Sequence, residues 1–101
     1  MRPLWLPALL SGLWQAGAPA LAADPAQGAR LYAVHCAGCH GGQGRAVLPT
    51  APDLSRPQAL MRADPVLLDE IRRGRGAMPA YAGVLRDREI LDIVAHLRTF
   101  R

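Results

Sequence analysis

The pentapeptide Cys36-Ala37-Gly38-Cys39-His40 constrains this chain most, because it holds the only two cysteines among 101 residues. In a C-x-x-C-H sequence the two thiols are close enough for each to form a thioether with a haem vinyl group. The histidine that follows is then held under the iron, where its imidazole can be the proximal ligand. We therefore predict one covalently attached haem c, bound through Cys36 and Cys39, with His40 as an iron ligand.

A cysteine pair at this spacing has two other common uses. A disulfide or a thioredoxin-like redox pair normally sits between a strand and a helix of a βαβ unit. No βαβ pattern precedes Cys36, because the preceding residues have a helical pattern. A structural zinc site requires four ligands at typical spacings, and beyond the cysteines the chain offers only His35, His40 and His96. Haem attachment is the favoured interpretation.

The amino-terminal residues 1–22 have the pattern of a secretory signal peptide. Arg2 supplies a positive charge, an apolar run follows, and Ala20-Leu21-Ala22 forms an A-x-A cleavage site. We predict cleavage after Ala22, a mature haem-binding domain at 23–101 and a periplasmic location. The alternative is an uncleaved membrane anchor, because no charge occurs between Arg2 and Asp24 and the stretch is just long enough to span a bilayer.

Size and charge narrow the possible functions. A mature domain this short has a thin core and usually needs a disulfide, metal or cofactor to fold, so the haem is expected to be a folding partner as well. The net charge is +4, and all 12 basic residues are arginine. These arginines are scattered without interleaved aromatic residues, so we predict no nucleic-acid partner. A mildly basic surface favours an acidic redox partner instead.

The local patterns predict three to four short helices and no strand. Asp24-Pro25 and Asp64-Pro65 each pair an N-cap residue with a proline at the first helical position. They begin helices from 24 towards 36 and from 64 to 73. Apolar residues recurring at intervals of three and four predict a last helix at about 87–99. Glycines and prolines predict loops at 41–58 and 74–85. The fold class is therefore all-α.

Together these features resemble the small class I cytochromes c, over residues 24–101. The resemblance rests on CAGCH, on the Gly28-to-Tyr32 spacing, and on the segments Thr50-Ala51-Pro52-Asp53-Leu54 and Ala77-Met78-Pro79-Ala80-Tyr81. It implies a small cytochrome c fold around one haem. It also implies that the first and last helices cross closely, with Gly28 and Tyr32 against Ile93 and His96.

The resemblance further implies a second axial ligand, because small cytochromes c bind the iron with a methionine thioether. Met78 fits this role, since it lies in a glycine-rich loop and the following proline disfavours helical conformation there. Met61 precedes a helix start and is expected to be a filler. The alternative for Met78 is plain core packing.

Other roles follow from the same resemblance. The Pro52 carbonyl would accept a hydrogen bond from His40 and so orient its ring, and Leu54 would cover the haem. Tyr81 and Arg56 are candidates for the haem propionates, with core packing as the alternative for Tyr81. We expect His35 to point to solvent and His96 to be a packed imidazole.

The expected function is an exported, monomeric, single-haem electron carrier that is not an enzyme. Iron with two protein ligands has no vacant position, so no small-molecule substrate is predicted. The partners would be periplasmic or membrane-associated redox proteins. Two alternatives stay open. One is a small haem subunit or accessory cytochrome of a periplasmic oxidoreductase, for example in nitrite reduction. The other is a haem enzyme or gas-binding domain with an open sixth position.

Overall fold

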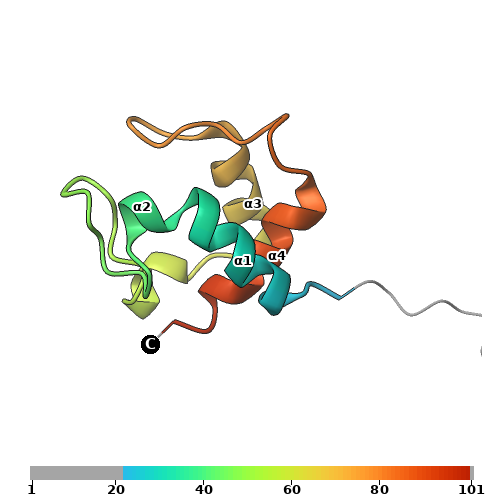
Figure 1. The fold of residues 1–101 in the computed structure, drawn as a ribbon, viewed down its shortest axis with the longest axis horizontal. Coiled ribbons are helices and arrows are strands. Elements are labelled where there is room, and N and C mark those ends of the chain that lie inside the picture. The colour runs from blue at the N-terminus through green and yellow to red at the C-terminus, as the bar shows by residue number, and fades with distance from the viewer. Residues whose placement is uncertain (1–21, 101) are drawn as a thin grey trace, which may run out of the picture.

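The structure, a computed structural model, describes residues 22–100. Within them lie four α-helices and one 3-10 helix: α1 (Pro25–His35), α2 (Ala37–His40), η2 (Pro57–Leu60), α3 (Asp64–Arg73) and α4 (Asp87–Leu97). Strand-like pairing in this part of the chain is limited to two isolated bridges, so the predicted all-α class is confirmed (Figure 1). The predicted signal peptide lies outside the described residues, except for its last residue.

Helix α1 begins where the sequence predicts, and two sets of hydrogen bonds fix its start. The Asp24 side chain accepts hydrogen bonds from the backbone N–H groups of Ala26, at 2.9 Å, and Gln27, at 3.3 Å. Such a cap satisfies N–H groups that have no partner within the helix. The N–H of Asp24 itself donates to Oδ1 of Asp92 in α4, at 2.7 Å. Asp92 is only 5% exposed, so a buried carboxylate ties the beginning of α1 to α4.

The crossing of α1 and α4 forms the packed side of the molecule (Figure 1). A Cβ atom on Gly28 would lie 1.9 Å from the backbone oxygen of Asp92, so no side chain fits there. One turn later, the Tyr32 ring packs edge-on against the His96 ring, with centroids 5.3 Å apart. The predicted crossing point is confirmed. The buried apolar core comprises Tyr32, Leu54, Leu67, Leu85, Ile90, Ile93, Val94 and Leu97.

Two element boundaries differ from the sequence prediction. Residues 57–60 form η2, which begins within the last two residues of the predicted 41–58 loop and has Pro57 as its first residue. The fixed φ of proline suits that position, so this proline begins a short helix instead of only breaking periodicity. Helix α4 ends at Leu97, two residues before the predicted end. There the Thr99 hydroxyl donates to the His96 carbonyl at 2.6 Å, a local side-chain bond that competes with helix continuation.

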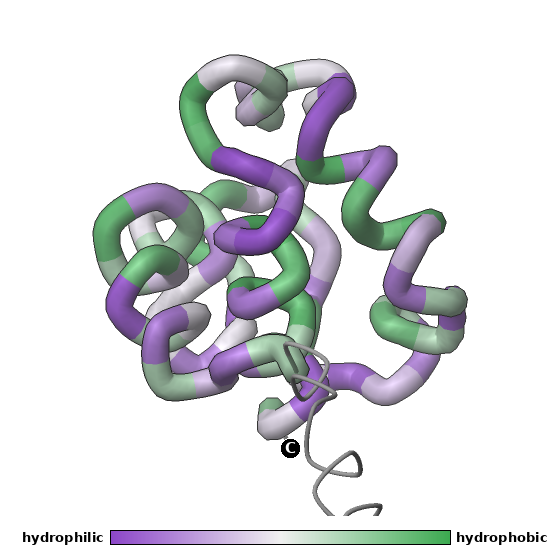
Figure 2. Tube along the Cα trace, turned by 90° about the vertical axis from the view of Figure 1, so that its right-hand side faces the viewer, coloured by the Kyte–Doolittle hydropathy of each residue, from purple (hydrophilic) through white to green (hydrophobic). Residues whose placement is uncertain are grey.

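Hydrophobic and hydrophilic residues alternate along the described helices (Figure 2). This pattern suits short helices that bury one face against a core. No helix among the described residues has the length and apolar character that crossing a membrane requires.

Candidate haem site

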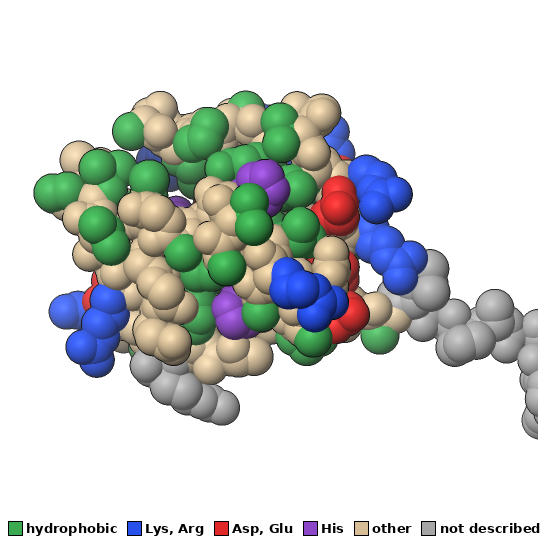
Figure 3. Space-filling model, in the orientation of Figure 1, with side chains coloured by type: hydrophobic (Ala, Val, Ile, Leu, Met, Phe, Trp, Pro, Cys, Tyr) green, Lys and Arg blue, Asp and Glu red, His purple; other side chains and the backbone are tan. Residues whose placement is uncertain are grey.

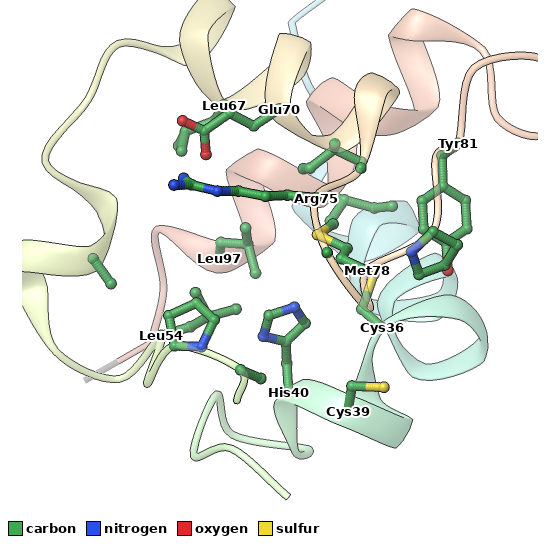
Figure 4. Close-up of a pocket in the computed structure, with 18 of the residues that line it drawn as sticks. Cys36, Cys39, His40, Leu54, Leu67, Glu70, Arg75, Met78, Tyr81 and Leu97 are labelled. Carbon is green, nitrogen blue, oxygen red and sulfur yellow. The ribbon is translucent and has the colours of Figure 1, made fainter. Parts of the chain in front are cut away.

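A cavity of about 840 Å³ lies between the crossing of α1 and α4 and the two loops at residues 41–56 and 74–86. Its lining includes Cys36, Cys39, His40 and Met78. His40 enters from α2, whereas Met78 enters from the loop that follows α3 (Figure 4). The two predicted iron ligands therefore come from separate chain segments and meet at one cavity.

The two cysteines lie on one side of this cavity and are not joined to each other (Figure 4). Cys36 is half-buried and Cys39 is exposed. Burial, and secondarily the charge of Cys39, raises the pKa of the Cys36 thiol to about 11. Reactive cysteines of redox pairs have the opposite shift, because the thiolate is their nucleophile. The environment of Cys36 is therefore unlike that of a thioredoxin-type pair.

The surroundings of the His40 imidazole favour its neutral form, which can act as a metal ligand. Burial lowers the pKa of His40, and the nearby Pro52 carbonyl partly opposes this shift. The Nδ1 atom is buried and makes no hydrogen bond of acceptable geometry, so the Pro52 carbonyl is close to the ring without forming a regular bond. A neutral imidazole is the form that binds metals.

Met78 is held by a tight turn at the beginning of its loop. The N–H of Arg75 donates to the Met78 carbonyl at 3.0 Å, and the N–H of Met78 donates to the Arg75 carbonyl at 2.8 Å. Gly74 permits this turn, because its φ is +70° and a Cβ there would lie 2.6 Å from the Met78 oxygen. The other internal methionine, Met61, is 74% exposed and does not line the cavity.

Pro52 and Leu54 both line the cavity, as the sequence predicts for residues near the haem. Leu54 is 9% exposed and belongs to the core. Its N–H donates to the Gly44 carbonyl at 2.8 Å, which ties this wall to the loop that follows α2. The wall is therefore positioned by backbone bonding as well as by apolar contact.

The expectations for four other residues have different outcomes. Arg56 is absent from the cavity lining and lies 3.5 Å from the Asp53 carboxylate, so it has a local acidic partner. The Tyr81 hydroxyl donates to the His35 carbonyl at 2.9 Å. His35 does not point freely to solvent: it is half-buried, and its ring packs edge-on against Tyr81. His96 is a packed imidazole, as predicted, with its ring 5.0 Å from that of Phe100.

Sequence reasoning missed the charged part of the lining. Arg62, Arg73 and Arg75 all contribute to it. Arg62 pairs with Glu70, and Arg73 pairs with Asp69 at 3.1 Å. The Arg75 side chain extends across the cavity, away from the cysteines (Figure 4). Helical spacing gave a partial signal, since the lining residues Leu67, Glu70, Ile71 and Gly74 recur at intervals of three and four along α3.

The residues present fit a covalently attached haem. The cavity volume lies within the range of about 300–1,000 Å³ typical of ligand and cofactor sites. Two unpaired thiols, a buried imidazole that favours its neutral form and a thioether sulfur border it. No three His, Cys, Asp or Glu side chains of the described chain cluster as a metal site would require, so the donor set suits haem better than a structural zinc ion.

Comparisons with known proteins agree with this fit. The family described as "Cytochrome C oxidase, cbb3-type, subunit III" matches residues 23–97. A cytochrome c6 of Picosynechococcus is 37% identical over 98 residues, covering 88% of this chain and 84% of that protein. A cytochrome c6 of Thermosynechococcus vestitus is 38% identical over 80 residues, covering 77% and 71%.

A solved structure of cytochrome c6 from the diatom Phaeodactylum tricornutum matches with a TM-score of 0.59 and 28% identity. The match covers 73% of this chain and 90% of that one. The sequence family and the fold thus agree with the attachment motif and its cavity. The chain therefore belongs to the small class I c-type cytochromes, which are single-haem electron carriers and not enzymes, and it carries one covalently attached haem c.

Proposed function

We propose that this protein is an exported, freely diffusing carrier that takes one electron from one redox protein and passes it to another. In this proposal Cys36 and Cys39 would attach the haem, and His40 and Met78 would hold its iron. The observation that supports it is the meeting of all four side chains at one cavity, from two separate segments of the chain.

When bound, the haem supplies one-electron chemistry through the ferric and ferrous states of its iron. The chain contributes fixed donors on both sides: His40 at the end of α2 and Met78 in a loop braced by a tight turn. Donors that keep their positions in both oxidation states limit the rearrangement each transfer requires. Apolar walls that include Leu54, Leu67 and Leu97 exclude water, and such burial tunes the reduction potential.

The Pro52 carbonyl is proposed to orient His40. The pKa of His40 supports this role, because the Pro52 carbonyl partly opposes the lowering caused by burial, as a hydrogen-bond acceptor near the ring does. An acceptor opposite one ring nitrogen fixes which nitrogen carries the proton and leaves the other for the metal. Leu54 is proposed to cover the haem, in keeping with its burial at the cavity wall.

The mature protein is proposed to be residues 23–101, released in the periplasm by cleavage after Ala22. The position of Asp24 supports this boundary, because the N-cap of α1 and the bond to Asp92 both begin there. Mass spectrometry of the exported holoprotein checks the proposal. A mass that retains residues 1–22 would favour the membrane-anchored alternative.

Redox proteins are the partners of this family, and we propose that this member meets them as a monomer through brief encounters. On the face in Figure 3, arginines gather at the margins beside acidic side chains, and hydrophobic side chains spread between them. Mixed charges of this kind suit a weak, salt-sensitive encounter.

The absorption spectrum of the haem-loaded protein, oxidised and reduced, with and without carbon monoxide, tests the ligand assignment. We expect a low-spin spectrum that carbon monoxide leaves unchanged. Met78→Leu should open the sixth position to carbon monoxide, whereas the matched control Met61→Leu should not, because Met61 is largely exposed. Ready carbon monoxide binding by the unmodified protein would remove Met78 as a ligand.

A second candidate function is a small haem subunit of a periplasmic oxidoreductase. The matching family description, which names an oxidase subunit, favours it. Mild solubilisation and size-exclusion chromatography of the native protein separate the two candidates. A free carrier elutes alone, whereas a subunit elutes at a fixed ratio with one oxidoreductase.

A further inference from the structure

Two tyrosine hydroxyls hydrogen-bond the backbone immediately before and immediately after residues 36–40. The Tyr81 hydroxyl donates to the carbonyl of His35, at 2.9 Å. The Tyr32 hydroxyl donates to the carbonyl of Gly41, at 2.5 Å. The haem-attachment segment is thus held at both ends by side chains that do not belong to it.

The two bonds differ in what they connect. Tyr32 lies in α1 and is 2% exposed, so its bond joins the attachment segment to the core. Tyr81 lies in the 74–86 loop, three residues after Met78, and Figure 4 shows its ring on the cysteine side of the cavity. Among the described residues, its hydroxyl makes the one hydrogen bond that joins this loop to residues 22–48.

The chain makes the His35 carbonyl available for this bond. In a regular α-helix the N–H of Cys39 would donate to the His35 carbonyl. Instead it donates to the Cys36 carbonyl, at 3.2 Å, where α1 ends and α2 begins. The break frees the His35 carbonyl, and a partly buried carbonyl needs another donor.

Other hydrogen bonds of the loop attach it to α3. The N–H of Tyr81 donates to Ile71, at 3.2 Å, and that of Ala82 donates to Arg72, at 3.1 Å. Both bonds hold the loop to α3. Burial raises the pKa of Tyr81, so its hydroxyl keeps the proton it donates.

We propose that the hydrogen bond from the Tyr81 hydroxyl to the His35 carbonyl acts as a clasp. It holds the 74–86 loop, which carries Met78, against the haem-attachment segment at residues 36–40. This inference rests on the proposed assignment of Met78 as the sixth ligand. Tyr81 is a positioning residue: it touches the backbone of the attachment segment, and it acts on the iron through the loop that bears Met78. Opening the clasp lets the loop move outward with its thioether while the cysteines and His40 stay in place.

The test is Tyr81→Phe in the ferric holoprotein, with Tyr32→Phe as the matched control. Both variants lose one hydroxyl and keep the ring. Imidazole added to ferric protein binds only when Met78 has left the iron, so its association rate reports opening of the loop. We expect a rate about fivefold higher in Tyr81→Phe, equivalent to about 1 kcal/mol for one hydrogen bond, and an unchanged rate in Tyr32→Phe.

Amide hydrogen exchange provides a second readout that does not depend on the iron. The amides of Tyr81 and Ala82 should exchange faster in Tyr81→Phe than in the unmodified protein, and those of α4 should not change. Unchanged imidazole and exchange rates in Tyr81→Phe would overturn the clasp. Equal increases in both variants would also overturn it, since they would indicate general loosening.

Met78→Leu separates the clasp from the ligand assignment. If this variant binds imidazole no faster than the unmodified protein, Met78 is not an iron ligand. The proposed assignment of Met78 as the sixth ligand then fails. The exchange rates of the Tyr81 and Ala82 amides then still report whether the hydroxyl holds the loop. If Met78→Leu opens the site and Tyr81→Phe does not, only the clasp fails.

Discussion

The side of the molecule where α1 crosses α4 and the side that faces the cavity are built in different ways. At the crossing, the two helices approach so closely at Gly28 that only a glycine fits, and Ile90, Ile93 and Val94 are almost fully buried. The cavity side consists of two long loops and short helical pieces, joined by single hydrogen bonds such as that of Leu54 to Gly44.

The difference indicates what each side depends on. The crossing satisfies its own packing requirements, because protein atoms fill the space between the helices. The cavity walls instead face a space of about 840 Å³ and need the haem to complete their contacts. The crossing should therefore respond to changes of one methyl group, and the cavity walls to the loss of the cofactor.

The largest expected effect is loss of the haem through Cys36→Ala combined with Cys39→Ala. At about 24 cal/mol per Å³, an empty cavity of this size would cost about 20 kcal/mol, and water entering the open mouth reduces that cost. Half of that cost, about 10 kcal/mol, would already match the total of about 5–15 kcal/mol that stabilises a typical domain. We expect far-ultraviolet circular dichroism to report a largely unfolded chain. Retained native helicity would mean that the crossing folds alone.

The next largest effect is expected from Gly28→Ala. The added Cβ would meet the Asp92 backbone oxygen, so α1 and α4 must separate, at a cost of about 3 kcal/mol or more, the upper part of the range for overpacked cores. Gly42→Ala is the matched control, because a Cβ there would meet no atom within 4 Å. Denaturant unfolding of both holoproteins gives the comparison. Equal denaturation midpoints for the two variants would show that α1 and α4 can separate at little cost in free energy.

A smaller effect is expected from Asp92→Ala, which removes the buried acceptor of the Asp24 N–H. The bond is part-buried, and a hydrogen bond to a carboxylate contributes about 1.5–3 kcal/mol. Asp24→Ala removes the helix cap and retains the backbone bond, so its cost should be about 1 kcal/mol. Thermal unfolding of the holoproteins ranks the two. The reverse order would mean that the cap, and not the bond to α4, fixes the start of α1.

The smallest effect concerns pH. Burial lowers the pKa of His96 from its ordinary value of about 6.5, so the folded state disfavours the protonated ring. Stability should be unaffected by His96 above about pH 6.5 and should fall as the pH drops through that value towards the lower folded pKa. His96→Phe should flatten this part of the profile of unfolding free energy against pH. An identical slope in the variant would assign the effect to another group.

Much of the fold was predictable because its signals are local. Asp24-Pro25 marks a helix start through capping chemistry and the fixed φ of proline, and the apolar spacing of 87–99 marks a buried face. The capping role predicted for Asp64 is wrong, because Asp64 is the first residue of α3 and makes no capping hydrogen bond, so at that start only the proline signal holds. The identity of the attachment motif and the choice of Met78 over Met61 also came from neighbouring residues. The exposure of Met61 and the position of Met78 in the cavity lining agree with that choice.

The rest depends on contacts that no local pattern encodes. The Tyr81 hydroxyl reaches a carbonyl 46 residues earlier in the chain, and the half-buried position of His35 follows from that contact. Arg56 was a candidate for the propionates, but its nearest acidic group, Asp53, is three residues away. The charged lining formed by Arg62 and Glu70 arises only when a loop and a helix are brought together.

The bond between Asp24 and Asp92 joins residues 68 apart, which has a consequence for how the protein is made. The chain emerges from the ribosome with its amino end first, and α1 has no partner until α4 has followed. Contacts this distant in sequence form late and slow folding. Residues 36–40 are therefore complete well before the last helix can pack, so the two thiols and the histidine stay accessible while the fold is still unfinished.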